Sequence, residues 1–230
     1  MRKVILLAFL LLSAGNSWAN IVINGTRVLY SENNKEVIVQ LINTGDAPAL
    51  VQSWIDDGDI NSTPETAKVP FLLSPPVVKV NEHNGQQLRI KKLPANLPAD
   101  RESVFFLNVL DIPPKPENME NQNTVQLAIK SRIKLFYRPA ALTGTLDDAA
   151  GKLTLISSGQ QIRILNKSPF HITVANISQG KTKLLQESPM VPPFGELTVA
   201  TRAAVKRGQT YQLMYVDDLG AYKTHTLISQ

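Results

Sequence analysis

The alternation of short apolar segments with turn residues is the feature that most limits how this chain of 230 residues can fold. Helical periodicity is almost absent, and the segments are rich in Val, Ile, Thr, Tyr and Phe. Side chains of these types suit pleated, half-buried strands. The pattern therefore predicts an all-β protein built from β-sandwiches.

The first half of the chain contains seven or eight predicted strands, which is typical of an immunoglobulin-like domain. Leu88 and Ile90 alternate with charged residues, which indicates a strand with one exposed face. Residues 104–110 are apolar on both faces and should form a central strand. The remaining predicted strands are 21–30 (interrupted at Asn24 and Gly25), 36–43, 50–55, 71–73, 77–80 and 124–137.

A break follows at residues 138–141, where Pro139 cannot continue a strand ladder. We therefore predict an N-terminal domain of residues 20–141 and a C-terminal β-sandwich domain of residues 142–230. Strands in the second half are expected near 153–156, 161–165, 172–177, 184–186, 197–201, 211–216 and 222–227.

The first 19 residues have the features of a secretory signal peptide. Arg2 and Lys3 precede an uncharged apolar run, and Ser17 and Ala19 are small residues where a signal peptidase reads the chain. The run is too short to span a bilayer, so cleavage is favoured over the alternative, an uncleaved anchor. The mature protein is expected to be soluble and to begin near Asn20.

Composition excludes several classes of function. The absence of cysteine excludes thiolate nucleophiles and zinc–sulfur sites, and leaves core burial to hold the fold together. Of the 24 Lys and Arg, two lie in the signal peptide, so 22 face 19 Asp and Glu in the mature chain. This net charge of +3 is mild and dispersed, which argues against a nucleic-acid partner.

The residues also lack a recognisable catalytic or metal-binding motif. His83, His171 and His225 are isolated in the sequence, and none has the spacing of a metal ligand. The acidic turn of residues 56–59 (DDGD) could suggest calcium, but it lacks the spaced ligands of a calcium loop and is interpreted as an ordinary turn. No enzymatic activity, metal or cofactor is therefore expected.

Two groups of residues could carry a binding function. Val125, Leu127 and Ile129 place three apolar side chains on one strand face, which is either a core face or an edge that pairs with another chain. Arg27 and Lys134 would form an anion site if the first and last strands of the N-terminal domain lie together, and a carboxylate would be a natural ligand. The alternative is two solvated strand charges.

Several stretches resemble the periplasmic pilus-assembly chaperones of the chaperone–usher pathway. They are, in chain order, residues 25–28 (GTRV), 52–54 (QSW), 70–71 with 74–76 (PF and SPP), 97–103 (LPADRES), 106–109 (FLNV), 112–114 (IPP), 126–129 (QLAI) and 133–141 (IKLFYRPAA). The resemblance implies two immunoglobulin-like β-sandwich domains in an L or boomerang arrangement. It also implies a periplasmic chaperone that binds, folds and caps pilin subunits by donor-strand complementation and delivers them to an outer-membrane usher.

The resemblance assigns roles to particular residues. Val125, Leu127 and Ile129 would be the side chains lent to the pilin, and Arg27 and Lys134 would hold the pilin's C-terminal carboxylate. A further group, Glu102, Arg138 and Asp218, would fix the angle between the domains, with Asp217 as an alternative to Asp218.

Strict alternation from residue 125 places Lys134 on the face opposite the lent side chains. A bulge near Lys130 and Ser131 is therefore expected. The short loop of residues 115–124 resembles the short-loop subgroup and indicates rod-like pili.

Two other functions fit the sequence less well. A structural pilus or adhesin subunit would have one domain and a separate donor segment, and a periplasmic hydrolase or ligand-binding protein would need convergent polar residues that the sequence does not show. Self-association through the same strand is plausible, because pairing with a second copy would cover its edge.

Overall fold

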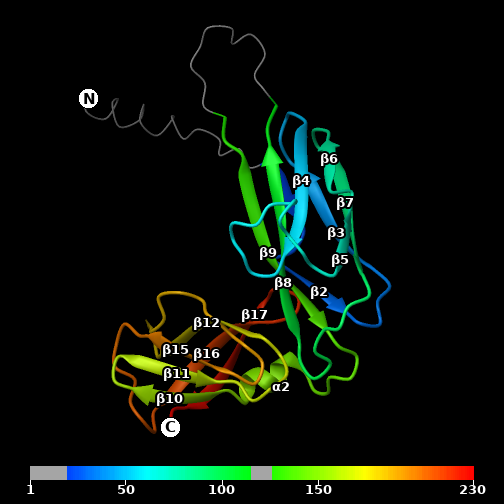
Figure 1. Cartoon of the computed structure of the whole chain (residues 1–230). Helices are drawn as coiled ribbons and strands as arrows, with labels where there is room; N and C mark the ends of the chain where they lie inside the picture. Colours follow the sequence, from blue (N-terminus) through cyan, green and yellow to red (C-terminus); the bar gives the residue numbers. More distant parts are fainter. Residues whose placement is uncertain (1–19, 115–125) are drawn as a thin grey trace, which may run out of the picture.

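The computed structural model describes residues 20–114 and 126–230. They form two β-sandwiches that meet at an angle, so that the protein has the shape of an L (Figure 1). This confirms the all-β, two-sandwich prediction. The predicted signal peptide and Val125 lie outside the described residues. No helix in the described part of the chain is long and apolar enough to cross a membrane.

The first sandwich consists of a four-stranded and a five-stranded sheet. The four-stranded sheet has the order β1 (Ile21–Ile23), β3 (Val37–Asn43), β7 (Gly85–Lys92) and β5 (Phe71–Ser74). The five-stranded sheet has the order β2 (Arg27–Ser31), β9 (Ile129–Arg138), β8 (Ser103–Ile112), β4 (Ala49–Asp56) and β6 (Val77–Val80). The apolar strand predicted to be central is β8, which lies between β9 and β4. Leu41, Leu88, Leu107 and Leu135 are fully buried between the sheets.

The second sandwich has its own core. One sheet has the order β10 (Thr154–Ser158), β11 (Gln161–Leu165) and β15 (Glu196–Ala200). The other has the order β13 (Thr182–Lys183), β12 (Ile172–Gln179), β16 (Thr210–Val216) and β17 (Tyr222–Ile228), with β14 (Met190–Val191) also paired to β12. The strand predicted at 184–186 is displaced: the nearby strand β13 ends at Lys183, and within 184–186 only Leu185 forms a β-bridge, an isolated one with Thr201.

One short helix, α2 (Leu146–Gly151), follows the connection between the sandwiches and was not predicted from the sequence. Thr145 caps it by accepting a hydrogen bond from the backbone N–H of Asp148. The helix buries Leu146, Ala149 and Ala150 against the second core. It therefore secures the start of the C-terminal domain.

The pairing of β9 leaves part of that strand open. On one side, β8 pairs with β9 from Ile129 to Tyr137. On the other side, β2 runs parallel to β9 but pairs only from Lys134 to Arg138. Residues 129–133, here called the open edge of β9, therefore have no neighbouring strand on that side among the described residues. The predicted strand start at 124 is wrong, at least for 126–128, because the ladder with β8 ends at Ile129.

The bulge expected near Lys130 and Ser131 is absent from the described pairs of β9 with β8. The register runs without a shift from Asp111↔Ile129 to Ser103↔Tyr137. Side chains therefore alternate strictly along β9, with Ile129 and Leu135 on the core face and Lys134 on the outer face. No bulge is needed, because the apolar row and the cations use opposite faces of one strand.

Candidate functional site

The apolar row of β9 continues past the end of the hydrophobic core. Leu135 is fully buried and Ile133 packs against the core, but Ile129 is 41% exposed and Leu127, just before the strand, is 73% exposed. Large aliphatic side chains exposed in this way, beside an unpaired strand edge, indicate a surface that binds another chain. Val125, the third predicted member of the row, lies outside the described residues.

Arg27 and Lys134 are brought together by the parallel pairing of β2 with β9. They are register partners, so their backbones lie one strand spacing apart. Arg27 donates from Nη1 to the backbone carbonyl of Val216 in β16 (3.2 Å), and its guanidinium carbon lies 5.7 Å from the centre of the Phe136 ring. Its Nε is buried and has no hydrogen-bond partner within the described chain. The pair therefore lies where the two sandwiches meet.

The electrostatics of this pair favour an anion. Burial lowers the pKa of Lys134, and the positive charge of Arg27 lowers it further. Burial also lowers the pKa of Arg27, and the carboxylates of Asp218, Asp217 and Glu102 only partly offset that effect. Two half-buried cations with too little negative charge around them form a site that a carboxylate would stabilise.

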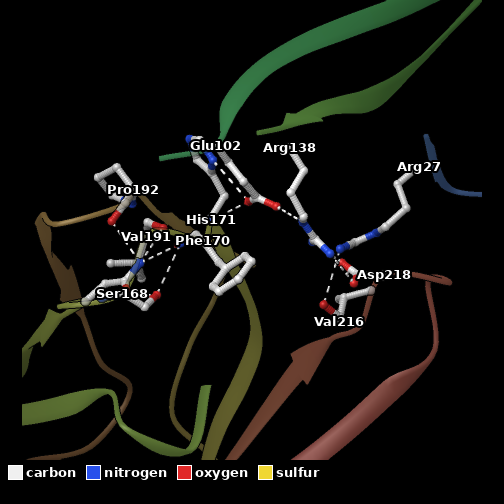
Figure 2. Close-up of polar contacts among 11 residues, drawn as sticks. Arg27, Glu102, Arg138, Ser168, Phe170, His171, Val191, Pro192, Val216 and Asp218 are labelled. Atoms are coloured by element: carbon white, nitrogen blue, oxygen red, sulfur yellow. Dashed lines mark hydrogen bonds and ion pairs between the residues drawn. The ribbon is translucent and has the colours of Figure 1, made fainter. Parts of the chain in front are cut away.

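A second charged group joins the two domains (Figure 2). Arg138, at the end of β9, donates from Nε to Glu102 Oε1 (2.7 Å) and from Nη1 and Nη2 to the two carboxylate oxygens of Asp218 (2.8 and 2.6 Å). Glu102 Oε2 accepts the backbone N–H of His171 from the C-terminal domain (2.7 Å). Burial opposes the charge of Arg138, but the hydrogen bonds to Asp218 and Glu102 outweigh it and raise the pKa. These contacts tie the two sandwiches together.

The structure also distinguishes the two neighbouring aspartates. Asp218 binds Arg138, whereas Asp217 accepts the backbone N–H groups of Leu219 and Ala221 and shapes its own turn. Sequence reasoning missed His171 because its contact with Glu102 uses a backbone group that no residue pattern reveals. The carbonyl of Val216 was missed for the same reason.

A third charged group lies on the outer face of the five-stranded sheet. Asp56, at the end of β4, accepts hydrogen bonds from Arg132 of β9 and Asn108 of β8. Asp56 belongs to the predicted acidic turn of residues 56–59, and Gly58 does donate its backbone N–H to Asp56. A signal was available, since a cation within an apolar strand requires either solvent or an anion. Among the described residues no cluster of three or more His, Cys, Asp or Glu could hold a metal ion.

Both domains match models of known protein families. Residues 20–143 match the family model described as "Pili and flagellar-assembly chaperone, PapD N-terminal domain". Residues 148–227 match "Pili assembly chaperone PapD, C-terminal domain". The chain belongs to the PapD family of pilus-assembly chaperones. The PapD-family assignment confirms the resemblance seen in the sequence.

Individual relatives agree with the PapD-family assignment. The chain is 41% identical to chaperone protein MrkB of Klebsiella pneumoniae over 225 residues, which is 96% of each protein. It is also 41% identical to the probable fimbrial chaperone YehC of Escherichia coli K12 over 204 residues, covering 89% of this chain and 84% of that one.

Solved structures show the same two-domain architecture. The Pseudomonas aeruginosa CupB2 chaperone has a TM-score of 0.78 at 32% identity, covering 91% of this chain and 100% of that one. A chain in the Salmonella enterica structure of SafA pilin in complex with the SafB chaperone has a TM-score of 0.81 at 25% identity, covering 93% and 98%.

Proposed function

We propose that this PapD-family chaperone works in the periplasm, where it captures pilin subunits by lending them the start of β9 and then delivers them to an outer-membrane usher. The observation that carries this proposal is the open edge of β9, which ends at the cation pair Arg27 and Lys134. The complex of the SafB chaperone with the SafA pilin supports a pilin as the partner.

The position of β2 explains why the two features belong together. A strand that pairs with residues 129–133 occupies the same place in the sheet as β2, just before β2 begins. If it runs parallel to β9, as β2 does, its last residue meets Arg27 and Lys134. Its terminal carboxylate then finds two cations. An antiparallel strand would place its C-terminus at the other end of residues 129–133, so its terminal carboxylate would lie away from these two cations.

The exposed apolar row would supply the side chains for the partner. Ile129 lies on the core face of β9 and Leu127 lies two residues before it, and we propose Val125 as the third member. Burial of each such side chain contributes roughly 1.5–3 kcal/mol. Main-chain pairing adds affinity that depends little on sequence, so one chaperone can serve several subunits. The partner's open edge and apolar groove are covered at the same time.

The interdomain group would hold the site in shape. Glu102, Arg138 and Asp218 link the end of β9 to the C-terminal domain directly beside Arg27. We propose that this link fixes the angle of the L, and with it the place of the carboxylate. Cleavage after residue 19, domain limits of 20–141 and 142–230, assembly of rod-like pili and pairing of two free copies through the open edge belong to the same proposal.

Co-purification tests the proposal. The full chain is expressed in a bacterial periplasm with a pilin tagged at its N-terminus, and the pilin is recovered by its tag. A one-to-one complex is expected with the unmodified chain and with Lys91→Ala, an exposed lysine of β7 in the other sheet. Loss of the complex is expected with Lys134→Ala. Equal recovery with Lys134→Ala would remove the carboxylate role, and recovery with none of the pilins tested would overturn the proposed function.

A further inference from the structure

Three cations of β9 lie on one face of the strand, two residues apart: Lys130, Arg132 and Lys134. This spacing creates a problem of register for a paired strand. A slip of one residue moves every side chain to the wrong face, but a slip of two restores the alternation. The apolar row therefore cannot distinguish a carboxylate at Lys134 from one at Arg132. Another feature must make that choice.

Arg132 already binds a carboxylate of this chain, that of Asp56. Its Nε and Nη2 donate to the two carboxylate oxygens of Asp56 (3.1 and 2.5 Å), and its guanidinium lies 3.7 Å from the centre of the Phe106 ring. The Asp56 side chain is only 1% exposed and is held in place by Asn108 Nδ2 (2.6 Å). A buried, bidentate and hydrogen-bonded pair of this kind resists displacement by a competing carboxylate.

The other two cations differ from Arg132. Lys130 is exposed at the start of β9, where Nζ donates to the carbonyl of Ile60 (2.9 Å), so water screens its charge. Lys134 forms no hydrogen bond or ion pair with the residues that the structure describes, and it lies beside Arg27. Of the three positions, only Lys134 combines burial, a second cation and the lack of an anion.

We propose that Asp56 determines the register of the bound strand. By neutralising Arg132, it leaves Lys134 with Arg27 as the place on β9 where the terminal carboxylate of a pilin strand binds. The proposal rests on the proposed function and names a residue that does not itself touch the pilin. Asp56 is thus a positioning residue. Its loss should change the register of the bound pilin strand more than it changes the affinity for the pilin.

Disulfide trapping can measure the register, because the chain has no cysteine of its own. Ser131→Cys places one thiol on the open edge, and the pilin carries a cysteine at one of two positions, two residues apart, in its last strand. Two residues span roughly 7 Å along a strand, which is beyond the tolerance of a disulfide. The unmodified chain should form the disulfide with one pilin variant only.

Asp56→Asn frees Arg132, and we expect the trapped product to divide between both pilin variants. Asp56→Asn combined with Arg132→Gln removes the competing cation, and a single register should return. A single, unchanged register in Asp56→Asn would overturn the proposal. If no pilin co-purifies with the unmodified chain, the proposed function fails instead, and the two failures are thereby distinguished.

A second measurement needs no change at Asp56 and applies even if Asp56→Asn does not fold. A pilin shortened by two residues at its C-terminus would place its carboxylate at Arg132 if it kept its register. We expect it to slip by two residues so that the carboxylate returns to Lys134, which moves the disulfide to the other pilin cysteine. An unchanged disulfide position would show that Arg132 accepts a carboxylate and would overturn the proposal.

A separate observation concerns the first described residue. Asn20 is only 6% exposed, and its backbone N donates to Asp111 Oδ2 (3.2 Å), as does the N–H of Ile21 (3.2 Å). The carbonyl of Asn20 accepts the N–H of Thr44 (2.7 Å). A Cβ on Gly45 would lie 2.2 Å from Asn20 Oδ1, so a larger residue there would displace the Asn20 side chain. These contacts hold the backbone of Asn20 in place beside Asp111.

Asp111 is short of hydrogen-bond donors. It is 7% exposed, and its second oxygen, Oδ1, is buried without a partner in the described part of the chain. A buried carboxylate with an unsatisfied oxygen is costly. A backbone amide at Asn20 supplies one hydrogen, whereas a free α-ammonium supplies three and a positive charge.

We infer that removal of residues 1–19 creates the missing partner, the α-ammonium of Asn20. Asp111 is the register partner of Ile129, so this ion pair would lie at the start of the open edge of β9. The N-terminal domain would therefore reach its full stability only after the signal peptide is cleaved. This inference rests on the proposed cleavage after residue 19 and on the contacts of Asp111, and it does not depend on the pilin.

Urea unfolding of four full-length mature proteins tests it: a chain that starts at Asn20, a chain that retains Ala19, and Asp111→Asn in each form. Retaining Ala19 should lower the folding equilibrium constant on the order of tenfold, because the charge moves away from the carboxylate. In Asp111→Asn the same extension should have little effect. An equal effect in both backgrounds, or none in either, would overturn the inference.

Acetylation of the Asn20 amine, which keeps one N–H and removes the charge, should match the extension and requires no substitution at Asp111. Unchanged stability after acetylation would also overturn the inference. N-terminal sequencing of protein from the periplasm gives a further check, since a mature chain that begins elsewhere would contradict it.

Discussion

Replacing Lys134 by methionine should make the free protein more stable and at the same time less able to capture a pilin. Methionine keeps an unbranched aliphatic side chain of similar reach and removes the charge. In the free protein, that charge is half-buried beside Arg27 and has no anion among the described residues. The folded state therefore bears a cost that only a ligand removes.

The size of both effects can be worked from the structure. Two unit charges about 5 Å apart repel by roughly 3 kcal/mol at an effective dielectric constant of about 20, which is an upper limit for neighbouring strands. Because both side chains partly reach solvent, we expect a gain of about 1 kcal/mol in the free energy of unfolding. The lost charge-assisted hydrogen bond to a carboxylate is worth about 1.5–3 kcal/mol, or roughly ten- to hundredfold in affinity.

The assay pairs urea unfolding of the free protein with titration of a pilin. Lys91→Met is the control, since it makes the same change at an exposed position of β7. Higher stability with weaker capture would support a binding site held ready for an anion. Lower stability with weaker capture would instead show that Lys134 supports the fold, and would refute the reasoning.

Three further outcomes follow from the described contacts. Glu102→Gln should weaken the link to Arg138 and lower stability by about 2–3 kcal/mol, with a broader distribution of interdomain angles in small-angle X-ray scattering; an unchanged scattering curve would count against the role in domain orientation. Leu135→Ala should cost about 2–5 kcal/mol in urea unfolding, since Leu135 is fully buried. Burial opposes the charge of Asp56, but the hydrogen bonds from Arg132 and its neighbours outweigh it and lower the pKa below the usual 3.8. The pair therefore stabilises the fold above about pH 4 and is lost on further acidification, so Asp56→Asn should flatten the acid limb of a stability curve.

The strand pattern of the N-terminal domain was largely predictable from residue types. Leu88 and Ile90 are buried on a strand whose other face is exposed, and β8 is central, as their apolar patterns indicated. Strand ends were less predictable, because a strand ends where its neighbour ends. β9 begins at Ile129, where its ladder with β8 ends, although β8 itself extends one residue further to Ile112.

The contacts of the charged site were likewise predictable only in part. The pairing of Arg27 with Lys134 could be predicted, because each is a cation in an apolar strand. The structure places the two residues in register. The partner of Arg132 could not be chosen from the sequence, since the three acidic residues of one turn, Asp56, Asp57 and Asp59, look alike. Contacts through backbone groups, such as those of His171 and Val216, leave no trace in residue types.

Hydrogen exchange of the chaperone, free and bound to a pilin, tests the central claim most directly. The account predicts that backbone amides of the open edge of β9, residues 129–133, become protected in the complex, because a new strand pairs there. Amides of β17, at the outer edge of the C-terminal domain, should exchange at the same rate in both states. Protection at β17 with none at residues 129–133 would contradict capture through β9.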